Sequence, residues 1–337
     1  MKLCPCRIFA VTGSDGKTTT TTIISELLKA QRYTVHLGGN IGRPLLCDVD
    51  DMKASDVAVL ELSSFQLHSM VCKPDVAVIT NISPNHLDKH KDYQDYIDAK
   101  SSIFAYQDEH DRLVLNHDNE FSAYYAGKAK SSISYFSRAV KPDNGVYCTG
   151  GYIYRVHDGS SQKLMAADDI KLPGTHNLEN YMAAFAATDG YVDDNTCISV
   201  AKSFSGVEHR LEQVRVLNGV TFINDSIGTS PTRTAAGLHA LKQKPILIAG
   251  GYDKHIPFDE LGDEICLHVK KLYLTGATTE KIYDAVTKSK YFDGNLPIEK
   301  IDDFKDAVLA AADSAQDGDV VLLSPACAAF DKFKNFM

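Results

Sequence analysis

The chain has 337 residues and a formal net charge of −9. This acidic balance argues against nucleic acid as the main partner, and no apolar run reaches the roughly 18 residues that a membrane helix needs. The length predicts two domains, each large enough to bury its own core.

The cysteine pattern and the N-terminus predict a cytoplasmic protein. The eight cysteines include no Cys-x-x-Cys pair. Cys4 and Cys6 lie too close together for the ligand spacing of a metal finger, so free thiols are expected. The first residues lack the apolar segment of a secretory signal. A reducing compartment and a protein without a membrane partner fit these features best.

The first part of the chain alternates β-like runs with helical ones, which predicts an α/β domain with a mostly parallel sheet. Two of the β-like runs, 57–60 and 76–79, are continuously apolar, as strands buried on both faces are. Short strands with glycine-rich turns between 131 and 171 predict a small antiparallel flap attached to this sheet. Strands are expected at 8–11, 34–37, 57–62, 76–82 and 112–116, and helices at 18–30, 93–105 and 177–191.

A phosphate-binding loop is the clearest motif of this part. The apolar run 7–11 leads into a loop with two glycines, followed by Gly-Lys-Thr and a helical pattern. Glycines let successive backbone N–H groups turn toward one anion, and the helix N-terminus adds partial positive charge. Lys17 would hold the β- and γ-phosphates of a nucleotide, and the Thr18 hydroxyl would ligate Mg²⁺. The residues expected to bind the nucleotide are Gly13, Ser14, Asp15, Gly16, Lys17, Thr18 and Thr19.

This loop departs from the usual motif, because the first glycine of G-x-x-x-x-G-K-T would fall at Val11. The alternative to a nucleotide site is an ordinary strand–turn–helix connection with a solvated lysine. Gly-Lys-Thr placed between a strand and a helix favours the phosphate loop.

Polar residues at the ends of two further strands extend the predicted site. Glu61 ends the apolar strand that follows the loop, where a carboxylate can hold Mg²⁺; a solvent-facing glutamate is the alternative. His86 follows the strand at 76–82 and could ligate a metal as neutral imidazole, with Asp88 orienting it. Lys100 falls among apolar residues of a helix, where a lysine usually snorkels its ammonium group to solvent.

A second βα series begins after Val207 and predicts a doubly wound, Rossmann-like domain. We therefore place the domains at 1–206 and 207–337. Arg210, at this junction, could reach an anion or make a surface ion pair. Three polar turns at strand ends, around Asp225, Lys254 and Ser324, together favour a binding crevice. Strands are expected at 220–224, 245–249, 271–274 and 320–323, and helices at 232–241, 258–266, 280–287 and 304–315.

These motifs resemble the Mur ligases over essentially the whole chain. The loop Gly13-Ser-Asp-Gly-Lys-Thr18 is similar to the short phosphate loop of that family. Three further stretches resemble the members that add D-glutamate to UDP-N-acetylmuramoyl-L-alanine. They are Gly38-Gly-Asn-Ile-Gly42, Glu61-Leu-Ser-Ser-Phe-Gln-Leu67 and Ser324-Pro-Ala-Cys-Ala-Ala-Phe-Asp-Lys-Phe-Lys-Asn-Phe336.

The resemblance implies an ATP- and Mg²⁺-dependent ligase of peptidoglycan precursor synthesis that forms an acyl phosphate on its muramoyl substrate. It implies phosphate and metal roles for Lys17, Thr18, Glu61 and His86, and a carbamylated Lys100 as a further metal ligand. It also implies a monomer whose small-molecule partners are UDP-N-acetylmuramoyl-L-alanine and D-glutamate. By the same resemblance, nucleotide contacts fall on Asn180, Arg210 and Asp225, and substrate contacts on Asn40, Ser63, Thr229, Lys254, Ser324, Ala329 and Phe336.

Three departures from the family leave alternatives open. The phosphate loop begins about a dozen residues from Met1, whereas the family carries a UDP-anchoring domain before it, so we expect that domain to be missing. The chain stops directly after Lys-Asn-Phe, where relatives usually continue. Asp225-Ser-Ile-Gly-Thr-Ser-Pro231 replaces a commoner pattern, and Ala329 stands where relatives often have serine. The alternatives are another Mur- or folylpolyglutamate-type ligase, or an inactive ATP-binding fragment.

Overall fold

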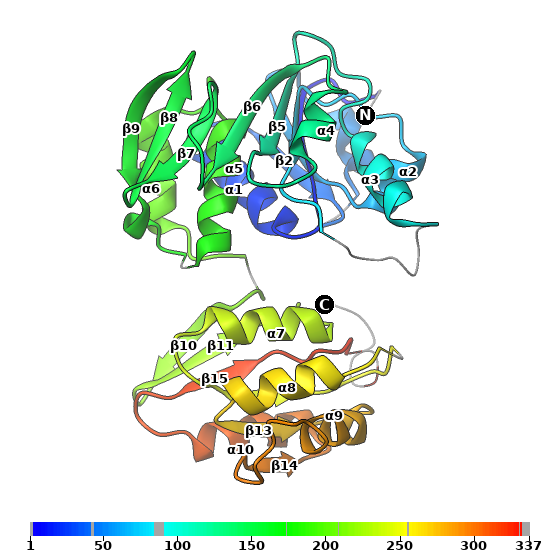
Figure 1. Ribbon diagram of the computed structural model, residues 1–337, viewed down its shortest axis with the longest axis vertical. Coiled ribbons are helices and arrows are strands. Elements are labelled where there is room, and N and C mark those ends of the chain that lie inside the picture. The colour runs from blue at the N-terminus through cyan, green and yellow to red at the C-terminus, as the bar shows by residue number, and fades with distance from the viewer. Residues whose placement is uncertain are drawn as a thin grey trace. The chain divides into compact units, whose positions relative to one another are not determined.

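The computed structural model divides into two compact units, residues 1–205 and 206–337, each with its own sheet (Figure 1). The structure describes residues 3–41, 44–83, 91–172, 174–207, 209–254, 256–329 and 331. Within these ranges, no helix is both long enough and apolar enough to cross a membrane.

The first unit is built on a nine-stranded sheet in the order β2-β3-β1-β4-β5-β6-β7-β8-β9. Pairing is parallel from β2 to β7, and antiparallel between β7, β8 and β9. The strands are β1 (Arg7–Thr12), β2 (Val35–Gly39), β3 (Val57–Glu61), β4 (Val76–Ile79), β5 (Arg112–Asn116), β6 (Ser132–Ser137), β7 (Gly145–Thr149), β8 (Tyr152–His157) and β9 (Ser160–Ala166).

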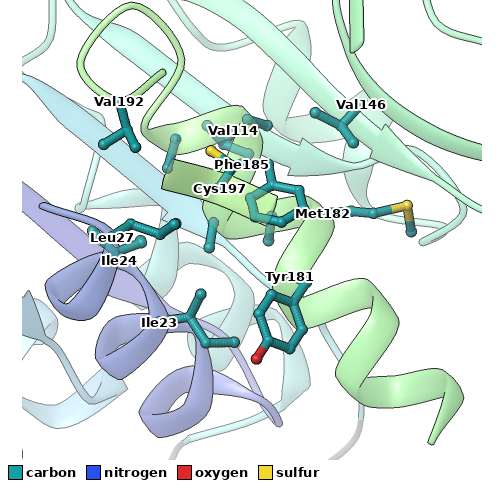
Figure 2. Close-up of a cluster of buried hydrophobic side chains, with 14 of the residues drawn as sticks. Ile23, Ile24, Leu27, Val114, Val146, Tyr181, Met182, Phe185, Val192 and Cys197 are labelled. Atoms are coloured by element: carbon teal, nitrogen blue, oxygen red, sulfur yellow. The ribbon is translucent and has the colours of Figure 1, made fainter. Parts of the chain in front are cut away.

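Helices cover both faces of this sheet, which is why its central strands are apolar at successive positions. On one face, α1 (Lys17–Ala30) and α5 (Thr175–Ala187) pack side by side with α6 (Asp194–Ser203). Figure 2 shows Ile23 and Leu27 of α1 together with Tyr181 and Phe185 of α5 in this core. The other face carries α2 (Ser64–Ser69), α3 (Tyr93–Ser101) and α4 (Ser122–Ala126). The 3-10 helices are η1 (Leu45–Asp51) and η2 (Ala167–Asp169).

The second unit has a six-stranded sheet in the order β10-β11-β15-β12-β13-β14, parallel except for the pair β10–β11. Helices α7 (Pro231–Ala240), α8 (Asp259–His268) and α9 (Thr279–Thr287) share one core, and α10 (Phe304–Ser314) packs into another. The strands are β10 (Glu212–Leu217), β11 (Val220–Asn224), β12 (Ile246–Ala249), β13 (Lys271–Leu274), β14 (Ile298–Lys300) and β15 (Val320–Leu323).

The predicted fold class is confirmed: a mostly parallel sheet with an antiparallel extension, then a second, Rossmann-like α/β unit. The antiparallel part is smaller than the flap expected at 131–171. The first strand of that range, β6, pairs parallel to both β5 and β7, so only β7, β8 and β9 pair in antiparallel fashion. The sequence patterns also missed the helices α2, α4 and α6, the short strand β14 and the edge strand β10. In β10 the apolar side chains of Val214 and Val216 are exposed. The strand therefore lacks the alternation of buried apolar and exposed polar residues by which a strand is predicted from sequence.

Candidate active site

The phosphate loop lies at the carboxyl edge of the first sheet, between β1 and α1. Two positive-φ glycines shape it, Gly13 (φ 150°) and Gly16 (φ 75°), and Gly16 is the N-cap of α1. The loop is held by the segment that follows β4, because the Ser14 N–H donates to the Asn81 carbonyl (2.9 Å) and the Asp15 N–H donates to Asn81 Oδ1 (2.8 Å). The helix N-terminus is thus presented at the edge where parallel α/β sheets bind ligands.

Lys17 folds back over this loop. Its ammonium group donates to the carbonyl oxygens of Gly13 (3.0 Å) and Ser14 (2.9 Å). These bonds place a positive charge above the N-terminus of α1, where an anion would bind. Lys17 is half-buried and its ammonium group is held against the loop, while nucleotide binding at this loop stays a prediction.

Glu61 is buried, with 2% of its surface exposed, so a solvent-facing glutamate is also wrong. One carboxylate oxygen accepts a hydrogen bond from the Thr18 hydroxyl (2.7 Å) and the other from Asn40 Nδ2 (2.8 Å). Asn40 follows β2 and Glu61 ends β3, and these strands are parallel neighbours. The sheet therefore brings a carboxylate against the Gly-Lys-Thr motif. Ser63, two residues on, caps α2 in a capping box with Gln66.

Lys100 is the least expected member of the site. It lies on α3 with 2% of its surface exposed, so the interpretation as a snorkelling lysine is wrong. Its Nζ donates to the Gly13 carbonyl (2.7 Å) and lies 3.4 Å from Thr12 Oγ1 and 4.6 Å from the centre of the Tyr96 ring. Burial, together with repulsion from the Lys17 charge, holds the pKa of the Lys100 ammonium group well below its ordinary value.

Asn180 reaches the loop from α5. Its Oδ1 accepts from the Thr20 hydroxyl (3.2 Å) and its Nδ2 donates to Asn177 Oδ1 (3.3 Å). A Cβ at Gly16 would lie 2.3 Å from Asn180 Oδ1, so the backbone of Gly16 passes directly over this amide. Thr19, in the first turn of α1, is buried.

The second unit holds a separate polar cluster at the ends of β11 and β15. Asp225 is buried; its Oδ2 accepts from Ser324 Oγ (2.7 Å) and its Oδ1 from the Leu211 N–H (3.2 Å). Ser324 Oγ also lies 2.8 Å from Thr234 Oγ1. Burial raises the pKa of Asp225, and the Ser324 hydrogen bond and the Arg210 charge act in the opposite direction.

Two predicted substrate residues also meet in this unit, since Lys254 Nζ donates to the Thr229 carbonyl (2.9 Å). Ala329 is exposed after β15. His86, Asp88 and Phe336 lie outside the described residues, so their predicted roles stay predictions.

The sequence reasoning missed four residues that shape the loop. Ser14 Oγ lies 2.7 Å from Tyr96 OH, and Thr80 Oγ1 donates to the Asp15 carbonyl (2.6 Å). Thr12, which ends β1, donates to the Leu62 carbonyl (2.8 Å), and Asn81 bonds the loop as described above. Thr80 and Asn81 directly follow β4, so the rule that pointed to Glu61 at the end of β3 could have found them.

The Mur ligase middle-domain model matches residues 11–188, and the model of the Mur ligase glutamate ligase domain matches residues 209–327. The chain belongs to the Mur ligase family. It is 52% identical over 339 aligned residues to the UDP-N-acetylmuramoylalanine–D-glutamate ligase of Acetivibrio thermocellus, covering 99% of this chain and 72% of that protein. The corresponding Clostridium novyi ligase is 48% identical and is covered to 73%.

Solved structures share the fold at low sequence identity. The MurF ligase of Thermotoga maritima in complex with ADP gives a TM-score of 0.65 at 21% identity, covering 94% of this chain and 76% of that one. Escherichia coli FolC in complex with DHPP and ADP gives 0.70 at 17% identity, with 96% and 87% covered. The two α/β units of this Mur ligase thus follow the architecture of these enzymes.

The loop leaves no room for a side chain at Gly16, the N-cap of α1. Gly16→Ala would place a Cβ 2.3 Å from Asn180 Oδ1 at a φ of 75°, so the loop must shift. We expect ATP affinity to fall about 10- to 100-fold, as one to three kcal/mol of strain and lost positioning would produce. Gly127→Ala is the matched control, because its Cβ meets only ordinary contacts at 3.5 and 3.8 Å. Equal ATP affinity of the two variants in calorimetric titration would contradict the proposed role of the loop.

The buried Lys100 makes stability depend on pH in a direction that can be measured. Its folded-state pKa is lowered, so between that pKa and about 10.5 the unfolded chain binds a proton that the folded chain does not. Stability therefore rises with pH across this window. Lys100→Met removes the penalty, and we expect it to stabilise the first unit at neutral pH by about 1–3 kcal/mol. Calorimetric melting should show this gain in stability shrinking as the pH rises. A gain that stays constant or grows with pH would contradict a lowered pKa of Lys100 in the folded chain.

Proposed function

We propose that this chain is the ligase that uses ATP to join D-glutamate to UDP-N-acetylmuramoyl-L-alanine in peptidoglycan precursor synthesis. The observation that carries the ATP chemistry is the contact of Thr18 with buried Glu61 beside the Lys17 ammonium group, at the N-terminus of α1. The choice of amino acid is supported by relatives of that name that are about half identical over the whole chain.

The phosphate loop would hold the nucleotide. Backbone N–H groups of the loop and the N-terminus of α1 attract the phosphates, and Lys17 neutralises charge that develops on the transferred γ-phosphoryl group. Ser14 and Asp15 would be fixed in place by Tyr96, Thr80 and Asn81 before the nucleotide arrives. Such preorganisation matters because phosphoryl transfer depends mainly on positioning and charge stabilisation.

The oxygen donors beside the loop fit a magnesium ion. Thr18 Oγ1 and Glu61 Oε2 lie 2.7 Å apart, and hydroxyl and carboxylate oxygens are the ligands that Mg²⁺ prefers. The chemistry that magnesium would supply there is positive charge that offsets the negative charge of the phosphates. Thr18 and Glu61 would hold it, and His86 and a carbamylated Lys100 are the further ligands that the family resemblance implies.

Lys100 has the properties that carbamylation needs. A neutral amine attacks carbon dioxide and loses a proton to give a carbamate, and a lowered pKa raises the neutral fraction. The product is an anion, so the repulsion between Lys17 and Lys100 would become attraction. Lys100 would then serve the site as a carboxylate rather than as a cation.

The remaining residues would position the nucleotide and the two other substrates. The roles rest on the family resemblance together with the local geometry described above. Asn180, Arg210 and Asp225 would contact the nucleotide; Asn40 and Ser63 would lie near the muramoyl substrate; and Thr229, Lys254, Ser324, Ala329 and Phe336 would receive D-glutamate.

The reaction would proceed in two displacements. A carboxylate oxygen of the muramoyl substrate attacks the γ-phosphorus and ADP leaves, which gives an acyl phosphate. The amine of D-glutamate then attacks the acyl carbon, and the tetrahedral intermediate expels phosphate and loses a proton to give the amide. The protein supplies position and charge neutralisation in both steps.

Phosphate release tests the reaction. We expect release from ATP to require UDP-N-acetylmuramoyl-L-alanine and D-glutamate together, with little release when either one is omitted. Release that is independent of the muramoyl substrate would contradict the proposed acyl phosphate.

A further inference from the structure

Three side chains with metal-binding atoms gather between α7 and α8, apart from the residues assigned to the ligase reaction. His239 lies in the last turn of α7, and Glu264 and His268 lie one turn apart on α8. Glu264 Oε2 is 2.6 Å from His239 Nε2 and 3.3 Å from His268 Nε2, and the two imidazole centres are 4.7 Å apart. All three ligand atoms lie within 4.8 Å of one another.

The two helices hold these side chains at a fixed spacing. Leu238, next to His239, is buried in the core of the second unit, as are Leu261 and Ile265 of α8. A separation of four residues puts Glu264 and His268 on one face of α8. Packing therefore fixes the backbone positions of the three residues. Their side chains stay partly open to solvent, with exposed fractions of 54% for His239, 28% for Glu264 and 39% for His268.

We propose that His239, Glu264 and His268 form a binding site for a divalent transition-metal ion of the zinc type. Two imidazoles and one carboxylate are a ligand set that zinc uses where a fourth position is left to water. Tetrahedral zinc with bonds of about 2.0–2.1 Å separates its ligand atoms by about 3.3–3.4 Å. The contact between Glu264 and His268 has this spacing already, and His239 has to withdraw from Glu264 by less than 1 Å. The two imidazole nitrogens lie within 4.8 Å of each other, so a rotation of the partly exposed His239 ring can bring them to the same spacing.

The ion would join the last turn of α7 to α8. Imidazole nitrogen also distinguishes this site from the oxygen-donor site beside the phosphate loop, because Mg²⁺ prefers oxygen ligands and Zn²⁺ accepts nitrogen. The competing explanation is a pair of ordinary ion pairs from two histidines to one glutamate, which needs no metal.

Zinc titration of the full chain separates the two explanations. We expect calorimetry with Zn²⁺ alone, in a reducing buffer without chelators, to show a site that weakens at least about 10-fold in Glu264→Gln and in His268→Ala. His110→Ala is the control, because His110 is an exposed histidine of the first unit. Zinc bound by the cysteines would be equal in all four proteins, so the difference reports on the cluster alone.

A second readout guards against variants that fold poorly. Zinc should raise the melting temperature of the parent chain and of His110→Ala more than that of Glu264→Gln, since an ion that binds only the folded state stabilises it. Equal zinc affinity and equal melting shifts in all four proteins would overturn the proposal and leave the cluster as ion pairs.

Discussion

Replacing Lys17 with alanine is expected to abolish ATP turnover. The ammonium group of Lys17 bonds to the Gly13 and Ser14 carbonyls and so lies above the N-terminus of α1. Without it, the γ-phosphoryl group would lose a full positive charge as negative charge redistributes in the transition state. Loss of one such preorganised group typically lowers the rate about 10²- to 10³-fold, and a displaced loop would add to this loss.

The matched control for this variant is Lys29→Ala. Lys29 lies on the same helix, in its last turn, and pairs with Glu26 at the surface. Exposed pairs of this kind contribute little to stability, so the control should turn over ATP at the parental rate. Phosphate release and melting temperature should be measured together. A Lys17→Ala protein that melts normally and keeps near-normal turnover would refute the phosphate-loop assignment.

Lys100→Ala is expected to lower the rate about 100-fold or more, and a small carboxylic acid such as formate or acetate should restore part of it. Truncation opens space beside the Gly13 carbonyl and Thr12, where the Lys100 ammonium group now lies. If the working form of Lys100 is a carbamate, an added carboxylate can replace its charge and its oxygen ligands. The rate should therefore rise with the concentration of the acid and then saturate.

Two measurements make this rescue specific. Lys17→Ala should not respond to the same acids, because it lacks a cation rather than a carboxylate. Carbon-13 NMR of the parent chain with labelled bicarbonate should show a carbamate signal that Lys100→Ala lacks. A Lys100→Ala protein that is active without added acid, or a parent chain without the signal, would contradict carbamylation.

The sequence predicted the positions of those site residues that follow from the order of strands, loops and helices along the chain. A strand, a loop and a helix follow one another around Lys17. Polar residues at the carboxyl ends of parallel strands meet at one edge of the sheet. The contact between Thr18 and Glu61 could therefore be expected from the order of the elements. The apolar runs predicted β3 and β4 for the same reason, since both strands are covered on two faces.

Other features depend on tertiary packing that the sequence does not encode locally. Burial of Lys100 results from the way α3 packs beside the loop, and a helical pattern with one lysine fits a snorkelling side chain equally well. Tyr96 belongs to the same helix, and its contact with Ser14 spans 82 residues of chain. The edge strand β10 forms because β11 pairs with it, although its own side chains are mostly exposed.

The choice of amino acid is the most direct test of the proposed function. With ATP and UDP-N-acetylmuramoyl-L-alanine present, phosphate release and amide formation should be compared for D-glutamate, L-glutamate, L-lysine and meso-diaminopimelate. We predict that D-glutamate alone supports both, with product and phosphate formed in equal amounts. Equal activity with L-lysine or meso-diaminopimelate would contradict the assignment as a D-glutamate-adding ligase.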